Sequence, residues 1–118
     1  MPIRKSTEFG AIDISLDAIA SLAGGAVTEC YGIVGMSSQK LLKDGWAVIL
    51  KRDNYSKGVV VRMEDNSLIL DLYIVALQGL KLSEIIQAAQ QRVKYELEKA
   101  LEIPVKAINV TVQGIRAL

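Results

Sequence analysis

The sequence predicts an α+β domain, a two-layer sandwich in which two helices cover one face of a four-stranded, mostly antiparallel sheet. Two stretches repeat apolar residues every three or four positions, as amphipathic helices do, and four others have the patterns of strands. The predicted order is strand, helix, short helix, strand, strand, helix, strand. The 118 residues contain no linker and no internal repeat, so we expect one domain over residues 1–118.

The first predicted strand covers residues 9–16, where Ile12 and Ile14 alternate with polar neighbours and are expected to face the core. Apolar residues then recur at helical spacing from residue 17 to residue 30. The change of period from two to about 3.6 marks the boundary between the strand and the helix.

The first helix has a predicted cap and an internal weakness. Ser15 or Asp17 is expected to cap its N-terminus. Gly24 and Gly25 lie inside it, where each glycine costs about 1 kcal/mol relative to alanine. We therefore expect another element to approach the helix closely at this pair.

An apolar segment with two glycines follows the helix. A glycine at this point favours the left-handed conformation that ends many helices, so we expect a backbone corner. Its apolar side chains either close the end of the core or form a contact surface, and both alternatives stay open. The segment consists of Tyr31, Gly32, Ile33, Val34, Gly35 and Met36.

The middle of the chain is expected to contain a short helix and a hairpin. Residues 37–56 have the least regular pattern, and the short helix is expected to begin near Asp44. The strands at residues 58–64 and 68–76 form a hairpin because the turn-forming residues 65–67 join them. The second of these strands is apolar on both faces, which favours a central place in the sheet.

The C-terminal third is predicted to form a helix and a strand. Residues 82–101 carry the most regular helical pattern, with Ser83 as the expected N-cap. Pro104 is expected to end the helix because it lacks a backbone N–H. The strand at residues 105–113 then returns to the sheet by a right-handed crossover.

The sheet face away from the helices is a candidate contact surface. A solvent-exposed face is normally polar, yet Val60, Ile69 and Val75 interrupt this one, together with Tyr73. A loop or an N-terminal arm that covers the face is the alternative. The predicted face comprises Asp13, Val60, Arg62, Ile69, Asp71, Tyr73, Val75, Asn109, Thr111 and Gln113.

The composition argues against an enzyme. The chain has no histidine and one cysteine, Cys30, which excludes histidine-based triads, zinc sites with histidine ligands and thiolate clusters. Asp13 and Asp71 are the one carboxylate pair that could face each other, and pairing with Arg62 explains them without catalysis. We expect no catalytic, cofactor-binding or metal-binding residues, and no cofactor. Cys30 is expected to be a small buried side chain in a reducing compartment.

A nucleic-acid-binding alternative rests on the Gly32–Gly35 loop. Its Gly-x-x-Gly pattern occurs in the KH module, whose loop clamps single-stranded RNA. KH loops place a basic residue near the glycines, whereas this one holds Ile33 and Val34. The net charge of +1 includes no basic block, so nucleic acid is not the expected partner.

Six segments spread over nearly the whole chain match a known pattern: residues 10–14, 29–36, 57–61, 70–75, 93–94 and 105–115. Their order and spacing resemble the alkaline-shock-protein family, the envelope-stress-response proteins of Gram-positive bacteria. Within the family the chain is most similar to the short YloU-like branch, which consists of the domain and little else. Gln78-Gly79 departs from the tyrosine-glycine pair that such proteins often show after the central strand.

The resemblance implies a non-enzymatic interaction or scaffold protein of the envelope stress response or of envelope homeostasis. We expect it to self-associate as a homo-oligomer or to bind a membrane-bound or envelope-related protein. No window approaches the ~20 apolar residues of a membrane span, so a cytoplasmic protein is expected, peripheral to the membrane only through a partner. The KH-like RNA-binding module stays as the alternative, and an accessory of a lipid-handling enzyme as a third.

Overall fold

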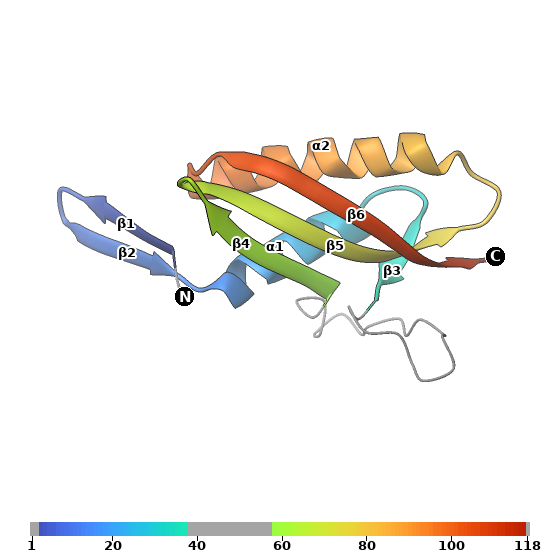
Figure 1. Ribbon diagram of the computed structural model, residues 1–118, viewed down its shortest axis with the longest axis horizontal. Coiled ribbons are helices and arrows are strands. Elements are labelled where there is room, and N and C mark those ends of the chain that lie inside the picture. The colour runs from blue at the N-terminus through green and yellow to red at the C-terminus, as the bar shows by residue number, and fades with distance from the viewer. Residues whose placement is uncertain (1–2, 38–57, 118) are drawn as a thin grey trace.

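The structure, a computed structural model, describes residues 3–37 and 58–117. The predicted α+β fold is confirmed: within the described part, two helices cover one face of a four-stranded sheet, and a two-stranded hairpin projects from one end (Figure 1). The short helix expected near Asp44 lies outside the described residues. The elements are β1 (Ile3–Thr7), β2 (Gly10–Ile14), α1 (Leu16–Thr28), β3 (Ile33–Met36), β4 (Val59–Glu64), β5 (Ser67–Leu77), α2 (Leu82–Leu101) and β6 (Val105–Arg116).

Strand β5 is the centre of the sheet, as its apolar sequence predicts. β6 pairs with it in parallel along nearly its whole length, from Leu68 to Leu77. On the other edge, β4 pairs antiparallel with the first half of β5 and β3 pairs antiparallel with the second half. The β4–β5 hairpin is confirmed, and its two turn residues, Asp65 and Asn66, have φ of 52° and 64°, as a type I′ turn requires.

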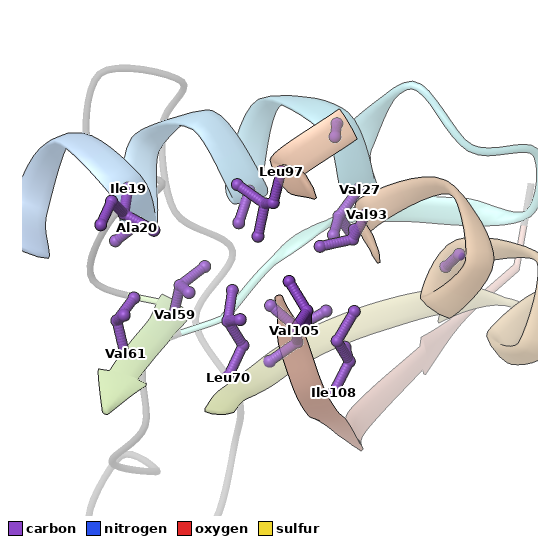
Figure 2. Packing of buried hydrophobic residues seen from close by; sticks show 14 of the residues in the cluster. Ile19, Ala20, Val27, Val59, Val61, Leu70, Val93, Leu97, Val105 and Ile108 are labelled. Carbon is purple, nitrogen blue, oxygen red and sulfur yellow. The ribbon is translucent and has the colours of Figure 1, made fainter. Parts of the chain in front are cut away.

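The core lies between the sheet and the two helices. Figure 2 shows Ile19 and Val27 of α1 and Leu97 of α2 directed toward Leu70 and its neighbours in the sheet. The helix-facing side chains of β5 are fully buried. Leu22 lies on the apolar stripe of α1 and Met63 is an apolar residue of β4, yet both are exposed, at 38% and 42%.

The helix ends partly follow the sequence prediction. Ser15 caps α1, since its Oγ accepts a hydrogen bond of 3.1 Å from the amide of Ala18. Ser83 does not cap α2: the N-cap is Lys81, without a side-chain hydrogen bond. The chain leaves α2 at Glu102, whose φ of 55° is left-handed, before Pro104 is reached.

The first predicted strand does not belong to the main sheet, which corrects the expected arrangement. Residues 10–14 form β2, which pairs only with β1 in the described part, so that Ile12 is 48% exposed and does not face the core. Its place in the sheet is taken by β3, in the segment that was expected to be a backbone corner. Four consecutive residues with a register shift between Ile33 and Gly35 make a short, irregular edge strand.

The close approach expected at the glycine pair of α1 is absent at Gly25, where an added Cβ would meet nothing within 4 Å. A close approach of another element occurs instead at Gly32. Its φ is +87°, and an added Cβ would lie 2.5 Å from Cδ1 of Ile85. The chain between α1 and β3 therefore packs directly onto the start of α2.

Candidate interaction surfaces

On the sheet face away from the helices, the predicted residues Arg62, Asp71 and Asn109 pair with one another. Asp71 accepts a hydrogen bond of 2.9 Å from Nδ2 of Asn109 and forms an ion pair of 3.2 Å with Nη2 of Arg62. Asp13 is not on this face, because it lies in the hairpin and pairs with Arg4 at 3.1 Å. The two carboxylates that could have faced each other are therefore apart, and each has a basic partner.

The apolar residues of this face are less accessible than predicted. Ile69 and Val75 are only 6% and 2% exposed, and Val60 and Tyr73 are half-buried. A binding partner would therefore meet mainly polar side chains here. The face keeps Tyr73 as a candidate contact, whereas Ile69 and Val75 are buried on this face and lie outside the core between the sheet and the helices.

The segment from Tyr31 to Met36 likewise contains both buried and exposed side chains. Met36 is fully buried and Ile33 is 8% exposed, so both side chains close the end of the core. Tyr31 and Val34 remain accessible at 77% and 44%. Because this segment is a strand on β5, it does not form the Gly-x-x-Gly loop that the KH-like alternative requires.

A groove lies at the end of the molecule where β5 leads into α2. It has a volume of about 460 Å³ and is lined mainly by apolar atoms. The α1–β3 connection contributes one wall, and the β5–α2 connection with the first two turns of α2 contributes the other. The residues that line it are Cys30, Tyr31, Gly79, Leu80, Lys81, Glu84, Ile85 and Ala88.

The hairpin of β1 and β2 is a surface that the sequence reasoning missed. One of its faces begins at Ile3, which is 7% exposed and packs in the core, and continues outward to the exposed Ile12. Phe9 in the tip is 93% exposed. We call the part beyond the body, residues 5–12, the arm. A signal was present, since Thr7, Glu8 and Gly10 are turn-forming residues that directly precede the alternating run of residues 11–14.

The side chains with shifted pKa values, Glu102, Glu64 and Cys30, lie in contacts within the chain. Lys5 on the arm donates a hydrogen bond of 2.8 Å to Glu102 beyond α2, and this bond lowers the pKa of the Glu102 carboxyl. The hydrogen bond from Lys106 lowers the pKa of the Glu64 carboxyl in the same way. Burial raises the pKa of the Cys30 thiol, which is half-buried and lies 3.4 Å from the carbonyl oxygen of Ala26.

Within residues 3–37 and 58–117, no three acidic or cysteine side chains come together as metal ligands. None of the helices described is long and apolar enough to cross a membrane. The described surface includes the arm, the groove and the exposed parts of the sheet as areas available for contact.

A family model described as the family of alkaline shock protein 23, with a "cell envelope-related function", represents the alkaline-shock-protein family and matches residues 4–117. The chain belongs to this family. YloU of Bacillus subtilis is a member of similar length, 44% identical over 116 residues, which cover 98% of this chain and 97% of YloU. Spy1614 of Streptococcus pyogenes is 40% identical over 118 residues, which cover all of this chain and 98% of the relative.

A more distant relative, YqhY of Bacillus subtilis, is 24% identical over 95% of this chain and 82% of its own length. All three relatives are described as uncharacterised. No solved structure matches the chain. The comparisons thus place the chain in a family with a cell envelope-related function.

Proposed function

We propose that this protein is a non-enzymatic interaction module with a role at the cell envelope, and that it acts by binding another protein, either a second copy or a separate partner. The observation that carries the proposal is the projecting arm. An isolated two-stranded hairpin is marginally stable in water, and this one exposes Phe9 at its tip and Ile12 on its face. Exposed apolar side chains gathered on one projection are typical of a protein-binding site.

The remaining surface supports binding rather than catalysis. Asp71, a carboxylate on the open sheet face, is held by Arg62 and Asn109. The thiol of Cys30 is protonated at neutral pH, since its pKa is raised by burial. A thiol with a raised pKa lacks the lowered pKa that a nucleophilic cysteine needs.

The proposal is tested in the bacterium that encodes the protein. The chromosomal gene is replaced by Phe9→Asp, and survival of the strain under cell-wall stress is compared with wild type and with a deletion strain. Phe9→Asp is expected to reproduce the deletion phenotype at an unchanged protein level, because the side chain is exposed and its loss does not affect the core.

Tyr95→Asp is the matched control, since Tyr95 is also a large exposed aromatic residue, at 62%, but lies on α2 away from the arm. This strain is expected to behave as wild type. A Phe9→Asp strain that survives stress as wild type does, when the deletion strain does not, contradicts an interaction through the arm.

A further inference from the structure

The geometry points to a head-to-tail contact between copies of this chain, in which the arm of one copy enters the groove of the next. The inference rests on the proposed function and names the partner as a second copy. Its basis is that the molecule carries an exposed apolar projection and an apolar groove at opposite ends of its longest axis. In Figure 1 the β1–β2 hairpin extends to the left, and the connection from β5 to α2 lies at the right.

The groove suits the tip of the arm in size and chemistry. Its volume of about 460 Å³ lies within the ~300–1,000 Å³ of typical ligand pockets and accommodates an aromatic ring with adjacent backbone. Leu80, Ile85 and Ala88 provide apolar walls. Phe9, which is 93% exposed in the single copy, would bury most of its ring there.

Charges at the two ends are also complementary. Glu8 precedes Phe9 in the turn and is exposed, and Lys81 lies on the rim of the groove with 82% of its side chain exposed. The partner of Lys81 within its own chain is Glu84, at a long 3.9 Å. A tip seated in the groove places the Glu8 carboxylate near the Lys81 ammonium, which fixes the direction of entry more than it adds affinity.

A contact between two different surfaces is heterologous, and here the arm and the groove lie at opposite ends of the molecule, so copies can add end to end. Repetition therefore gives an open chain of copies rather than a closed dimer. One turn seated in one groove is expected to bury less than the ~1,200–2,000 Å² of stable complexes, so the number of copies in an assembly should depend on protein concentration.

The test uses light scattering coupled to size exclusion, with the full-length protein from ~10 µM to ~1 mM, a range suited to weak contacts. The wild-type mass is expected to rise with concentration beyond twice the 12.8 kDa of one chain. Phe9→Asp removes the tip and Ala88→Glu blocks the groove. Each variant is expected to stay at the mass of one chain, and Tyr95→Asp is expected to associate as wild type does.

An equimolar mixture of the two blocked variants tests whether the contact joins the arm of one copy to the groove of another. Phe9→Asp keeps an intact groove and Ala88→Glu keeps an intact arm, so one contact can form between them. The mixture is expected to reach the mass of two chains and to stop there. Ala88→Glu should not disturb folding, because Ala88 is exposed on a helix and glutamate is a strong helix former.

Cross-linking supplies a second measurement that does not require loss of association. In a Cys30→Ser background, one chain carries Glu8→Cys at the tip and another carries Tyr31→Cys at the groove. A short bismaleimide is expected to join them only when the two are mixed. Lys99→Cys, near the far end of α2 from the groove, replaces Tyr31→Cys as the control and should give no cross-link.

Several results overturn the inference: a wild-type protein that remains one chain at ~1 mM, association that survives Phe9→Asp, a mixture of blocked variants that stays at one chain while wild type associates, or tip-to-tip cross-links. A monomeric wild type combined with a stress-sensitive Phe9→Asp strain would refute the head-to-tail contact alone. In that case the arm binds a separate protein, and the proposed function stands.

Discussion

At Gly25 the fold does not require a glycine. This residue lies inside α1, and an added Cβ would meet nothing within 4 Å. Gly25→Ala is expected to raise the free energy of unfolding by about 1 kcal/mol, because alanine loses less conformational entropy in a helix. Urea denaturation of the wild type and the variant measures the difference.

Gly32→Ala is the matched change with the opposite expected sign. The φ of +87° disfavours any side chain, and the new Cβ would overlap Cδ1 of Ile85. The free energy of unfolding is expected to fall by at least ~1 kcal/mol. Equal effects of the two alanines would contradict the packing described here between the α1–β3 connection and α2.

The Lys5–Glu102 pair gives the arm a pH-dependent attachment. The pKa of Glu102 is lowered in the folded chain, so the pair contributes above the unfolded pKa of about 4.3, and the contribution is lost as pH falls through the folded pKa. Both groups are exposed and the pair is weak. We therefore expect a local effect, with lower heteronuclear NOE values for β1 amides at about pH 3 than at about pH 6.5.

Glu102→Gln at about pH 6.5 should reproduce the low-pH behaviour of β1, since it removes the charge and keeps the side-chain length. The amides of β5 serve as the internal reference, because that strand lies in the centre of the sheet. If the β1 values respond neither to pH nor to Glu102→Gln, the pair does not hold the arm.

At the scale of elements, the two isoleucines on one face of the hairpin separate stability from association. Ile3 packs in the core at 7% exposure, whereas Ile12 is 48% exposed. Ile3→Ala is expected to lower the free energy of unfolding by about 2 kcal/mol, and Ile12→Ala by less than ~0.5 kcal/mol. Ile12→Ala should instead weaken self-association, which sedimentation velocity measures.

The pair is informative because both changes remove the same atoms from strands of the same hairpin. Differences in β propensity therefore cannot explain a difference in outcome. A loss of stability in Ile12→Ala as large as that in Ile3→Ala would place the arm against the body rather than in solvent.

The sequence predicts the elements that have a long regular pattern. Helix α2 is predicted at its structural bounds, and the buried residues Ile85, Val93 and Leu97 all lie on its predicted apolar face. The β4–β5 hairpin is likewise predicted, because a turn sequence separates two apolar runs. Such elements are predictable because burial alone imposes their periodicity.

Elements with few apolar residues are not predictable in this way. β1 contains one apolar residue, Ile3, so it has no alternation to detect. β3 has four residues, including a glycine, and its assignment depends on pairing with β5, which lies far away in the sequence. The pairing partner of β2 also depends on tertiary structure. The alternation of its residues predicts a strand but does not tell which sheet the strand joins.

The candidate surface is affected by the same limitation. Tyr31 and Val34 are exposed as a contact surface requires, but Ile69, Val75 and Met36 are buried. Strand alternation assigns a residue to a face and does not tell whether its neighbours cover it. Among the described residues Phe9 is the most exposed aromatic side chain, but the alternating pattern of residues 9–16 places it at the start of a core-facing strand.

At the scale of the whole molecule, the arm gives the domain an elongated shape, with extents of 51 × 30 × 23 Å. Copies joined arm to groove extend along the 51 Å axis and leave the two shorter dimensions unchanged. Copies joined through the open sheet face, near Tyr73, would instead thicken the particle. The direction of growth therefore distinguishes the two surfaces.

Small-angle X-ray scattering measures this direction. As concentration rises, the maximum dimension is expected to increase while the cross-sectional radius of gyration stays constant, because each added copy lies end to end with the last. Tyr73→Asp is expected to leave this growth unchanged, and Phe9→Asp to abolish it. A cross-section that increases with concentration, together with a Tyr73→Asp variant that stays at one chain, would assign association to the sheet face. The exposed arm would then need a separate protein as its partner.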